Sequence, residues 1–274
     1  MELRDKVVVV TGGASGIGLG LTERFHAEGA SHIVVADLDE AGAVAAAKRV
    51  GGTGVALDVS DEAAVAALVE QAEDAHGPID LFVSNAGYVT VGGLEIDDSE
   101  ILGMFDVHVM AHIYAARAVL PSMIARGEGY LLNTASAAGL LAQVGSLAYT
   151  VTKHAAVALS EWIAITHGYQ GIKVSVLCPQ AVATNITENS PSRDRPGGGM
   201  LGVAARDGVL SPDQLADTVI EALAAERFHV LPHDEVATYV ERKASDVDRW
   251  IGGMQRMQAR LYGDNPQPGD WLVS

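Results

Sequence analysis

A tyrosine and a lysine lie four residues apart, Tyr149 and Lys153, in a stretch that is predicted to be helical from about residue 148 to 167. Side chains four positions apart project from one face of a helix. A free tyrosine has a pKa of about 10, and a nearby ammonium favours its phenolate form. Such a phenol can take a proton from an alcohol or return it, and Ser136, after a predicted strand, can hydrogen-bond the reacting oxygen. A Tyr-x-x-x-Lys pair alone is a common accident, so other patterns must support this chemistry.

A second pattern suits an anionic ligand. Residues 11–18, Thr-Gly-Gly-Ala-Ser-Gly-Ile-Gly, lie between a predicted strand at 6–11 and a predicted helix at 16–28. Glycine allows a tight turn and a close approach of the backbone to a ligand, and a helix N-terminus presents unpaired N–H groups to an anion. The pattern therefore predicts a pyrophosphate site, whose candidate residues are Gly12, Ser15, Gly16, Ile17 and Gly18.

Asp37 ends the second predicted strand, nineteen residues after Gly18. An acidic group at this place in a dinucleotide fold accepts hydrogen bonds from the adenosine ribose hydroxyls. Its charge would repel the 2′-phosphate of NADP, and the next residue, Leu38, offers that phosphate no cation. The sequence therefore predicts NAD as the cofactor, the alternative being that Asp37 is only a solvated carboxylate in a loop.

These candidate residues lie at the ends of alternating apolar runs and helical stretches. The predicted strands are 6–11, 33–36, 53–57, 79–84, 130–134, 173–178 and 228–231. The predicted helices are 16–28, 40–49, 104–126, 148–167 and one that Ser60 caps and that runs to about residue 76. Short apolar strands separated by helices indicate parallel strands buried on both faces, and right-handed crossovers then favour a doubly wound α/β sheet of about seven strands. We expect one domain over residues 1–274.

Composition excludes several classes of protein. Hydrophobic residues make up 49% of 274 residues, which is enough for a large core and argues against disorder. The net charge of −17 argues against binding to nucleic acid or to anionic membranes. The first six residues are too charged for a signal peptide, and no run approaches the ~18 apolar residues of a membrane span. We expect a cytoplasmic protein, in which the lone Cys178 is a buried strand residue.

Further motifs share the order and spacing of one family. They are Thr11 to Gly18, Asp58-Val59 after the third predicted strand, Asn85-Ala86-Gly87 after the fourth, Ser136 thirteen residues before Tyr149 to Lys153, and Pro179 and Thr184 after the sixth. With these motifs, over roughly residues 3–231, the chain resembles the short-chain dehydrogenase/reductase family of the classical type. The resemblance implies a Rossmann fold and an NAD-dependent oxidoreductase that interconverts a secondary alcohol and a ketone.

The resemblance also assigns roles to single residues. Asp58 and Val59 would flank the adenine, and Asn85 would stabilise the sheet beside the cofactor, next to Ala86 and Gly87. Val182 and Thr184 would touch the nicotinamide end, together with Pro179. Lys153 would bind the nicotinamide ribose as well as tune Tyr149.

Three positions depart from the family pattern, and one of them is Ser84, where many members carry an additional asparagine. His108 stands where the family usually has an asparagine that anchors a water of the proton relay, so the relay is either rebuilt around His108 or bypasses it. Gln180 replaces the glycine of the usual Pro-Gly pair and is placed to reach into the cleft. His108 and His112 are four residues apart, but the glutamate of a zinc-hydrolase helix and a third ligand are missing, so we expect no metal.

The sequence leaves the substrate open. A polar, glycine-rich connection at 185–211 is predicted to be a substrate lid. An apolar stripe along 233–262 predicts a long C-terminal helix, which packs on its own domain, contacts another subunit or lines the substrate cleft. We expect a homotetramer or homodimer formed through the long helices. The residues expected to line the cleft for an apolar, neutral substrate are Leu140, Leu141, Gln143 and Val144.

Two other functions remain open alongside the enzyme. A sensor or scaffold of the same fold would bind the dinucleotide without turnover, which the changes at His108 and Gln180 make conceivable. An enzyme of this fold with non-redox chemistry is the third option. The intact set of Ser136, Tyr149 and Lys153 argues against the sensor or scaffold. The glycine turn with Asp37 argues against the enzyme with non-redox chemistry.

Overall fold

A computed structural model of the chain describes residues 1–192 and 202–263. Seven parallel strands form one sheet in the order β3-β2-β1-β4-β5-β6-β7, which confirms the predicted doubly wound α/β sheet. The strands are β1 Val7–Thr11, β2 His32–Asp37, β3 Thr53–Ala56, β4 Leu81–Ser84, β5 Gly129–Thr134, β6 Ile172–Leu177 and β7 His229–Val230. The strand order reverses between β1 and β4, and the carboxyl ends of strands at such a reversal form a ligand-binding crevice.

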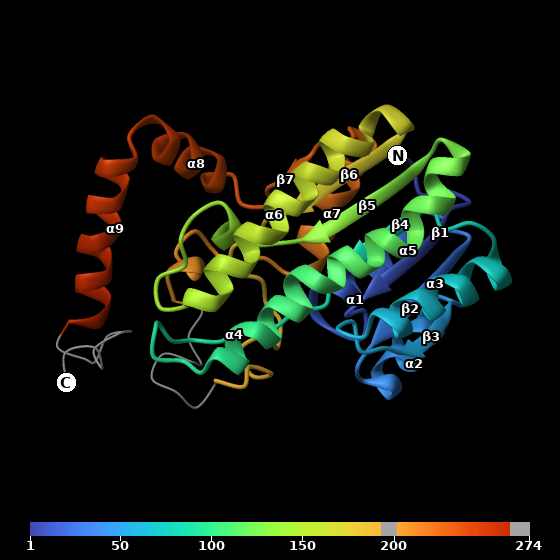
Figure 1. Cartoon of the computed structure of the whole chain (residues 1–274), viewed down its shortest axis with the longest axis horizontal. Coiled ribbons are helices and arrows are strands. Elements are labelled where there is room, and N and C mark those ends of the chain that lie inside the picture. The colour runs from blue at the N-terminus through green and yellow to red at the C-terminus, as the bar shows by residue number, and fades with distance from the viewer. Residues whose placement is uncertain (193–201, 264–274) are drawn as a thin grey trace.

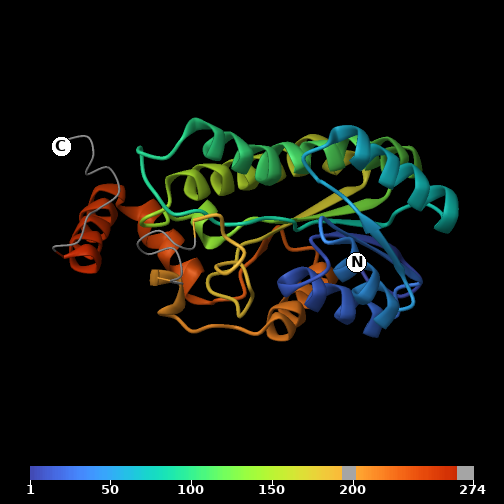
Figure 2. The ribbon, with the colours of Figure 1, turned by 90° about the horizontal axis from the view of Figure 1, so that it is seen from below.

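Helices cover both faces of the sheet, as Figures 1 and 2 show. One face carries α1 Gly16–Ala27, α2 Glu40–Arg49 and α7 Pro212–Ala224, which pack with Val8 and Val10 of β1 in one hydrophobic cluster. The other face carries α3 Glu62–His76, α5 Ala111–Arg126 and α6 Leu147–His167, which pack with Val7 and Val9 in a second cluster. Alternate residues of one buried strand thus supply both cores.

Two local predictions about helices are corrected by the structure. Ser60 does not cap α3, because the side chain of Asp61 accepts the hydrogen bonds from the N–H groups of Ala63 and Ala64. The helix predicted at 104–126 begins earlier, as α4 Asp98–Phe105, and passes through a π-helical turn at Asp106–Met110 before α5. A π turn holds one residue more than a turn of α-helix. The hydrophobic periodicity of the sequence therefore did not predict it.

The C-terminal extension, residues 233–263, is not one long helix. It consists of α8 Glu235–Ser245 and α9 Val247–Tyr262, which break at Asp246. The Asp246 side chain accepts a hydrogen bond from the N–H of Arg249 and so begins a new helix. Figure 1 shows both helices at one end of the molecule, outside the sheet.

The continuous helical stretch 98–126 is long and apolar enough, by length and composition alone, to cross a membrane, which the sequence analysis did not expect. Of its most apolar window, 44% is buried inside the structure. The stretch packs against α3 and α6, as the core helix of a layered α/β protein does.

Candidate active site

One large cavity, of about 970 Å³, runs along the carboxyl ends of the central strands. It extends from the glycine turn after β1 to α9 in the C-terminal extension. The predicted site residues that line it are Gly12, Ser15, Gly16, Ile17, Asp37, Asp58, Val59, Asn85, Ala86, Gly87, His108, Ser136, Tyr149, Lys153, Pro179, Val182 and Thr184. Leu141, Gln143 and Val144 also line the cavity.

Gly18 and Leu140 do not line the cavity. Gly18 lies beneath the glycine turn, where an added Cβ would stand 2.1 Å from the carbonyl oxygen of Gly12. Leu140 packs against a small core cluster around β5 and β6, and its carbonyl oxygen accepts a hydrogen bond from Lys243. Gly18 thus allows the turn to close, and the prediction that Leu140 contacts substrate is wrong for its side chain because that side chain turns into the core.

The glycine turn leaves the N-terminus of α1 free for an anion. Ser15 precedes the helix, but its side chain makes no capping hydrogen bond, and the first turn of α1 contains no acidic residue. The N–H groups of that turn therefore lack the side-chain partner that usually satisfies them. Gly12 has a φ of +65°, and a Cβ there would stand 2.8 Å from the Cα of Ala86. These features fit the pyrophosphate of a dinucleotide.

Asp37 is tied to the same turn. One carboxylate oxygen accepts a hydrogen bond from the N–H of Ala14 at 3.0 Å, and the other accepts one from the N–H of Asp39 at 3.1 Å. The carboxylate is half-buried at the rim of the cavity, beside the exposed Leu38. This fixed carboxylate, with no cation next to it in the sequence, fits a ribose with free hydroxyls.

Asn85 joins the turn to the middle of the sheet. Its amide nitrogen donates to the carbonyl oxygens of Thr11 and Gly12, at 3.2 and 3.3 Å. Its amide oxygen accepts a hydrogen bond from Thr134 Oγ1 at 3.1 Å. One side chain therefore holds the ends of β1, β4 and β5 in register beneath the cavity.

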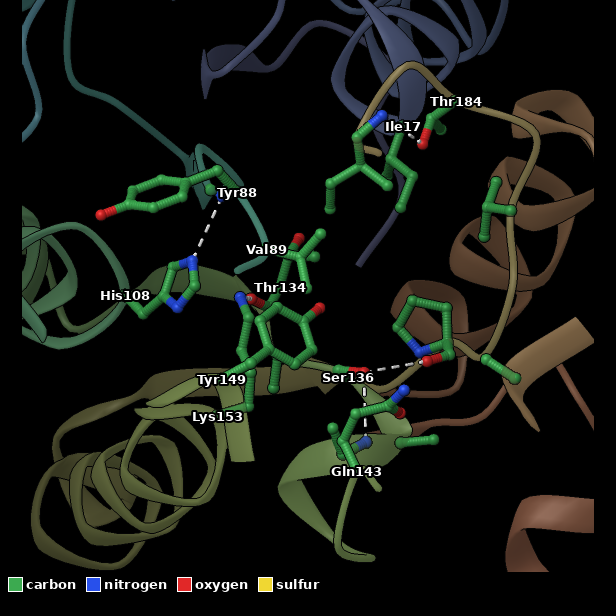
Figure 3. A pocket seen from close by; sticks show the side chains of 18 of the residues that line it. Ile17, Tyr88, Val89, His108, Thr134, Ser136, Gln143, Tyr149, Lys153 and Thr184 are labelled. Carbon is green, nitrogen blue, oxygen red and sulfur yellow. Dashed lines mark hydrogen bonds between the residues drawn. The ribbon is translucent and has the colours of Figure 1, made fainter. Parts of the chain in front are cut away.

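Ser136, Tyr149 and Lys153 meet in the same cavity (Figure 3). Lys153 Nζ lies 5.6 Å from the centre of the Tyr149 ring and donates to the carbonyl oxygen of Thr134 at 2.9 Å. Ser136 Oγ accepts a hydrogen bond from the N–H of Ala138 and donates to the carbonyl oxygen of Pro179. The hydroxyl and the ammonium are thus held by the main chain on either side of the phenol.

The protonation of this group is set first by burial. Burial raises the pKa of Tyr149 above its ordinary value, and the hydroxyl of Ser136 acts in the opposite direction. Burial lowers the pKa of Lys153 to about 8. The expected lowering of the Tyr149 pKa by Lys153 is therefore not found in the chain alone, where desolvation of the phenolate is the largest cause of the shift.

His108 is held on both ring nitrogens. Nε2 accepts a hydrogen bond from the N–H of Tyr88 at 3.3 Å, as Figure 3 shows, and Nδ1 lies 3.0 Å from Thr152 Oγ1. Since Nε2 accepts, the ring is neutral and Nδ1 carries the proton. The next histidine, His112, is also buried, and within residues 1–192 and 202–263 its ring nitrogens have no hydrogen-bond partner. Among these residues no group of three or more His, Cys, Asp or Glu side chains could hold a metal ion.

The two buried histidines predict that the fold loses stability in mild acid. Burial lowers the pKa of His112 to about 3 and that of His108 well below its ordinary value of 6.5. In the unfolded chain both accept protons as the pH falls through about 6.5, whereas in the folded chain they do not. Each histidine should therefore reduce the free energy of unfolding by about 1.4 kcal/mol per pH unit below 6.5, down to the folded-state pKa.

This pH effect is measured by urea unfolding at pH 7.0 and 5.0. The His112→Leu variant should show a smaller loss between these values than the unaltered chain, because one of the two sites is gone. Replacing the half-exposed His154 with leucine serves as the control. An equal loss in the His112→Leu variant and the unaltered chain would contradict the assignment.

Several residues of the cavity escaped the sequence analysis. They are Tyr88, Val89, Gly103, Asp106 and Val107. Residues of the predicted lid (Ala204, Arg206 and Asp207) and of the C-terminal stripe (Tyr239, Met254 and Met257) also line the cavity. The five missed residues come from the chain between β4 and α5, whose place relative to the cavity no local pattern reveals. For α7, by contrast, a signal was present: Ser211 and Gln214 form a capping box around Pro212.

Comparison with known proteins places this arrangement in a family. The model of the short chain dehydrogenase family matches residues 6–195. The chain is 33% identical over 260 residues to 1-deoxy-11-beta-hydroxypentalenate dehydrogenase of Streptomyces exfoliatus, covering 92% of this chain and 91% of that protein. It is 32% identical over 200 residues to meso-2,3-butanediol dehydrogenase of Serratia marcescens, covering 71% and 78%.

A solved structure shows the same fold. It is a short chain dehydrogenase/reductase from Burkholderia phymatum in complex with NAD, with a TM-score of 0.83 and 31% identity over 90% of this chain and 96% of that one. The chain belongs to the short-chain dehydrogenase/reductase family. It is an oxidoreductase of that family that uses a nicotinamide dinucleotide.

Proposed function

We propose that the protein is an NAD-dependent dehydrogenase that interconverts a secondary alcohol and a ketone. The observation that carries this proposal is the meeting of Tyr149, Lys153 and Ser136 in the cavity that begins at the uncapped N-terminus of α1. A mere dinucleotide-binding protein has no physical need for a phenol, an ammonium and a hydroxyl fixed side by side.

The proposed roles follow from the positions of the side chains. When bound, the nicotinamide accepts or supplies the hydride that leaves or reaches the carbinol carbon. As the phenolate, Tyr149 Oη takes the proton of the alcohol oxygen in oxidation, and as the phenol it returns that proton in reduction, while Ser136 Oγ hydrogen-bonds the same oxygen. Lys153 holds the ribose, and its positive charge favours the phenolate. Both ring nitrogens of His108 are hydrogen-bonded within the protein. We therefore assign His108 to holding the backbone at Tyr88 in place, and not to carrying a proton of the relay.

Several of the remaining lining residues are apolar, and these support an apolar, neutral substrate. Leu141 and Val144 follow Ser136 in sequence and line the cavity, and Trp250 and Met254 line it from α9. Two relatives are named as dehydrogenases of a 1-deoxy-11-beta-hydroxypentalenate, which is a carboxylate, and of a meso-2,3-butanediol.

We also propose that the chain forms a homodimer or homotetramer through its long helices. Trp162 and Ile165 on α6 leave 59% and 75% of their surface exposed in the single chain, and Phe105 is exposed at the end of α4. Large apolar side chains gathered on long helices are typical of an interface between copies.

The function is tested by following NADH formation at alkaline pH with a panel of secondary alcohols, and NADH consumption with the matching ketones. Turnover that depends on a secondary alcohol is the expected result. Calorimetric binding of NAD without turnover of any alcohol or ketone would favour a non-catalytic sensor or scaffold instead.

Replacing Asp37 with alanine is expected to remove the preference for NAD. The charged acceptor of the ribose hydroxyls is lost, and so is the repulsion of a 2′-phosphate. A hydrogen bond to a charged group corresponds to roughly a 10- to 100-fold change in affinity, so the ratio of kcat/KM for NAD to that for NADP should fall by at least about 10-fold. Asp39→Ala on the same loop is the control, because the Asp39 side chain makes no capping hydrogen bond. An unchanged ratio in the Asp37→Ala variant would refute the ribose role.

A further inference from the structure

Three segments that border the cavity meet at Gln180, which follows β6. The N–H of Gln180 donates to His233 Nδ1 at 3.2 Å, at the start of the C-terminal extension. Its side-chain amide donates to Asp207 Oδ2 at 2.8 Å, in the segment that precedes α7. A residue next to Pro179, at the predicted nicotinamide end, is therefore bonded to both segments that close the far side of the cavity.

Asp207 continues the connection into α8. Its second carboxylate oxygen, Oδ1, accepts a hydrogen bond from the hydroxyl of Tyr239 at 3.1 Å. The Tyr239 ring packs on Trp250 of α9, with 6.2 Å between the ring centres. We call the hydrogen-bonded set Gln180, Asp207 and Tyr239 the clasp.

Little else fixes the extension to the sheet. Of the side chains described on α8 and α9, only Val236 is fully buried. Lys243 Nζ adds one hydrogen bond to the carbonyl oxygen of Leu140 at 2.7 Å. Because so few side chains of α8 and α9 are fully buried, hydrogen bonds to the rest of the chain contribute much of the positioning of these two helices.

The side chains that the clasp holds in place are apolar. Trp250, Met254 and Met257 of α9 line the end of the cavity that lies farthest along the chain from the glycine turn. An indole and two thioethers can pack against a wide hydrocarbon surface. A small alcohol that fills only the space around Tyr149 would make few contacts with these side chains.

We propose that Gln180 is a positioning residue, which acts through Asp207 and Tyr239 to set the α9 wall against bulky apolar substrates such as fused-ring secondary alcohols. This inference rests on the proposed dehydrogenase function and adds the size class of its substrate. Gln180 donates and Asp207 accepts, so the direction of the hydrogen bond can be reversed without changing the shape of either side chain.

The test is a charge swap in the full chain. Gln180→Glu places a second carboxylate against Asp207 and should break the clasp by repulsion. The double variant Gln180→Glu/Asp207→Asn restores it, because the new amide donates to the new carboxylate and its oxygen still accepts from Tyr239. Gln255→Glu, which adds the same negative charge at an exposed position of α9, is the control.

Two measurements are made on each variant. In Gln180→Glu the KM for decahydro-2-naphthol should rise by about 10-fold or more relative to the KM for 2-butanol, the size expected for one lost charged hydrogen bond. Amide exchange in residues 235–262 should also become faster, since opening there no longer breaks the clasp. The double variant should return both values to within about threefold of the unaltered chain, as coupled partners in a double-mutant cycle do.

Equal changes in KM for the two alcohols, or a double variant no better than Gln180→Glu, would overturn the inference. Turnover of no alcohol or ketone of the panel by the unaltered chain would contradict the proposed function itself. The exchange rates then still report separately whether the clasp holds the extension.

Discussion

Replacing Tyr149 with phenylalanine is expected to lower kcat for alcohol oxidation by about 100-fold or more, the usual contribution of a general acid or base. The change removes one oxygen atom and leaves the ring, which packs edge-on against the His108 ring at 5.6 Å between centres. NAD should still bind within about threefold of the unaltered affinity, because the glycine turn and Asp37 are untouched. Stopped-flow or steady-state NADH absorbance gives the rate, and calorimetry gives the affinity.

The matched control is Tyr169→Phe. Tyr169 is 85% exposed and lies away from the cavity-lining residues, so the same loss of a phenolic oxygen should leave kcat unaltered. Activity of Tyr149→Phe within a few-fold of the unaltered chain would show that another group carries the proton.

Replacing Gly18 with alanine is expected to weaken NAD binding by roughly 10- to 100-fold, the equivalent of 1–3 kcal/mol of overpacking. The new Cβ would stand 2.1 Å from the carbonyl oxygen of Gly12 and 2.7 Å from Asn85 Nδ2, so the turn itself must move. Backbone atoms cannot yield as a flexible side chain does, and the N–H groups aimed at the phosphates move with them.

Gly168→Ala tests whether the effect is local. Gly168 lies at the end of α6, and a Cβ there meets no atom within 4 Å. Calorimetric titration with NAD should give the same Kd for this variant as for the unaltered chain. A Gly18→Ala protein that binds NAD with unchanged affinity would mean that the phosphates do not rest on this turn.

The fold and the glycine turn could be predicted because their signals are local. Val7 to Thr11 is an unbroken apolar run, as a strand buried on both faces requires, and the glycines follow it directly. Tyr149 and Lys153 come from one helix, so their spacing alone predicts that they share a face. Their location within one cavity with Ser136 follows from the parallel order of β5 and β6.

The remaining features depend on contacts between distant segments. Gln180 and Tyr239 are 59 residues apart, and nothing in either neighbourhood indicates that Asp207 joins them. The raised pKa of Tyr149 likewise depends on how much of the fold surrounds the ring, which spacing does not give. The break at Asp246 was missed because the apolar stripe continues across it at helical spacing.

The extension follows the last strand and adds no strand to the sheet. A chimera joined at Pro232, between β7 and α8, would receive the selectivity of another enzyme and keep its own reaction chemistry. Residues 180 and 207 would have to be replaced together with the extension. They lie outside it, but they form the hydrogen bonds that connect it to the rest of the chain. In this chain, a new C-terminal extension would then call for matching changes at two internal positions.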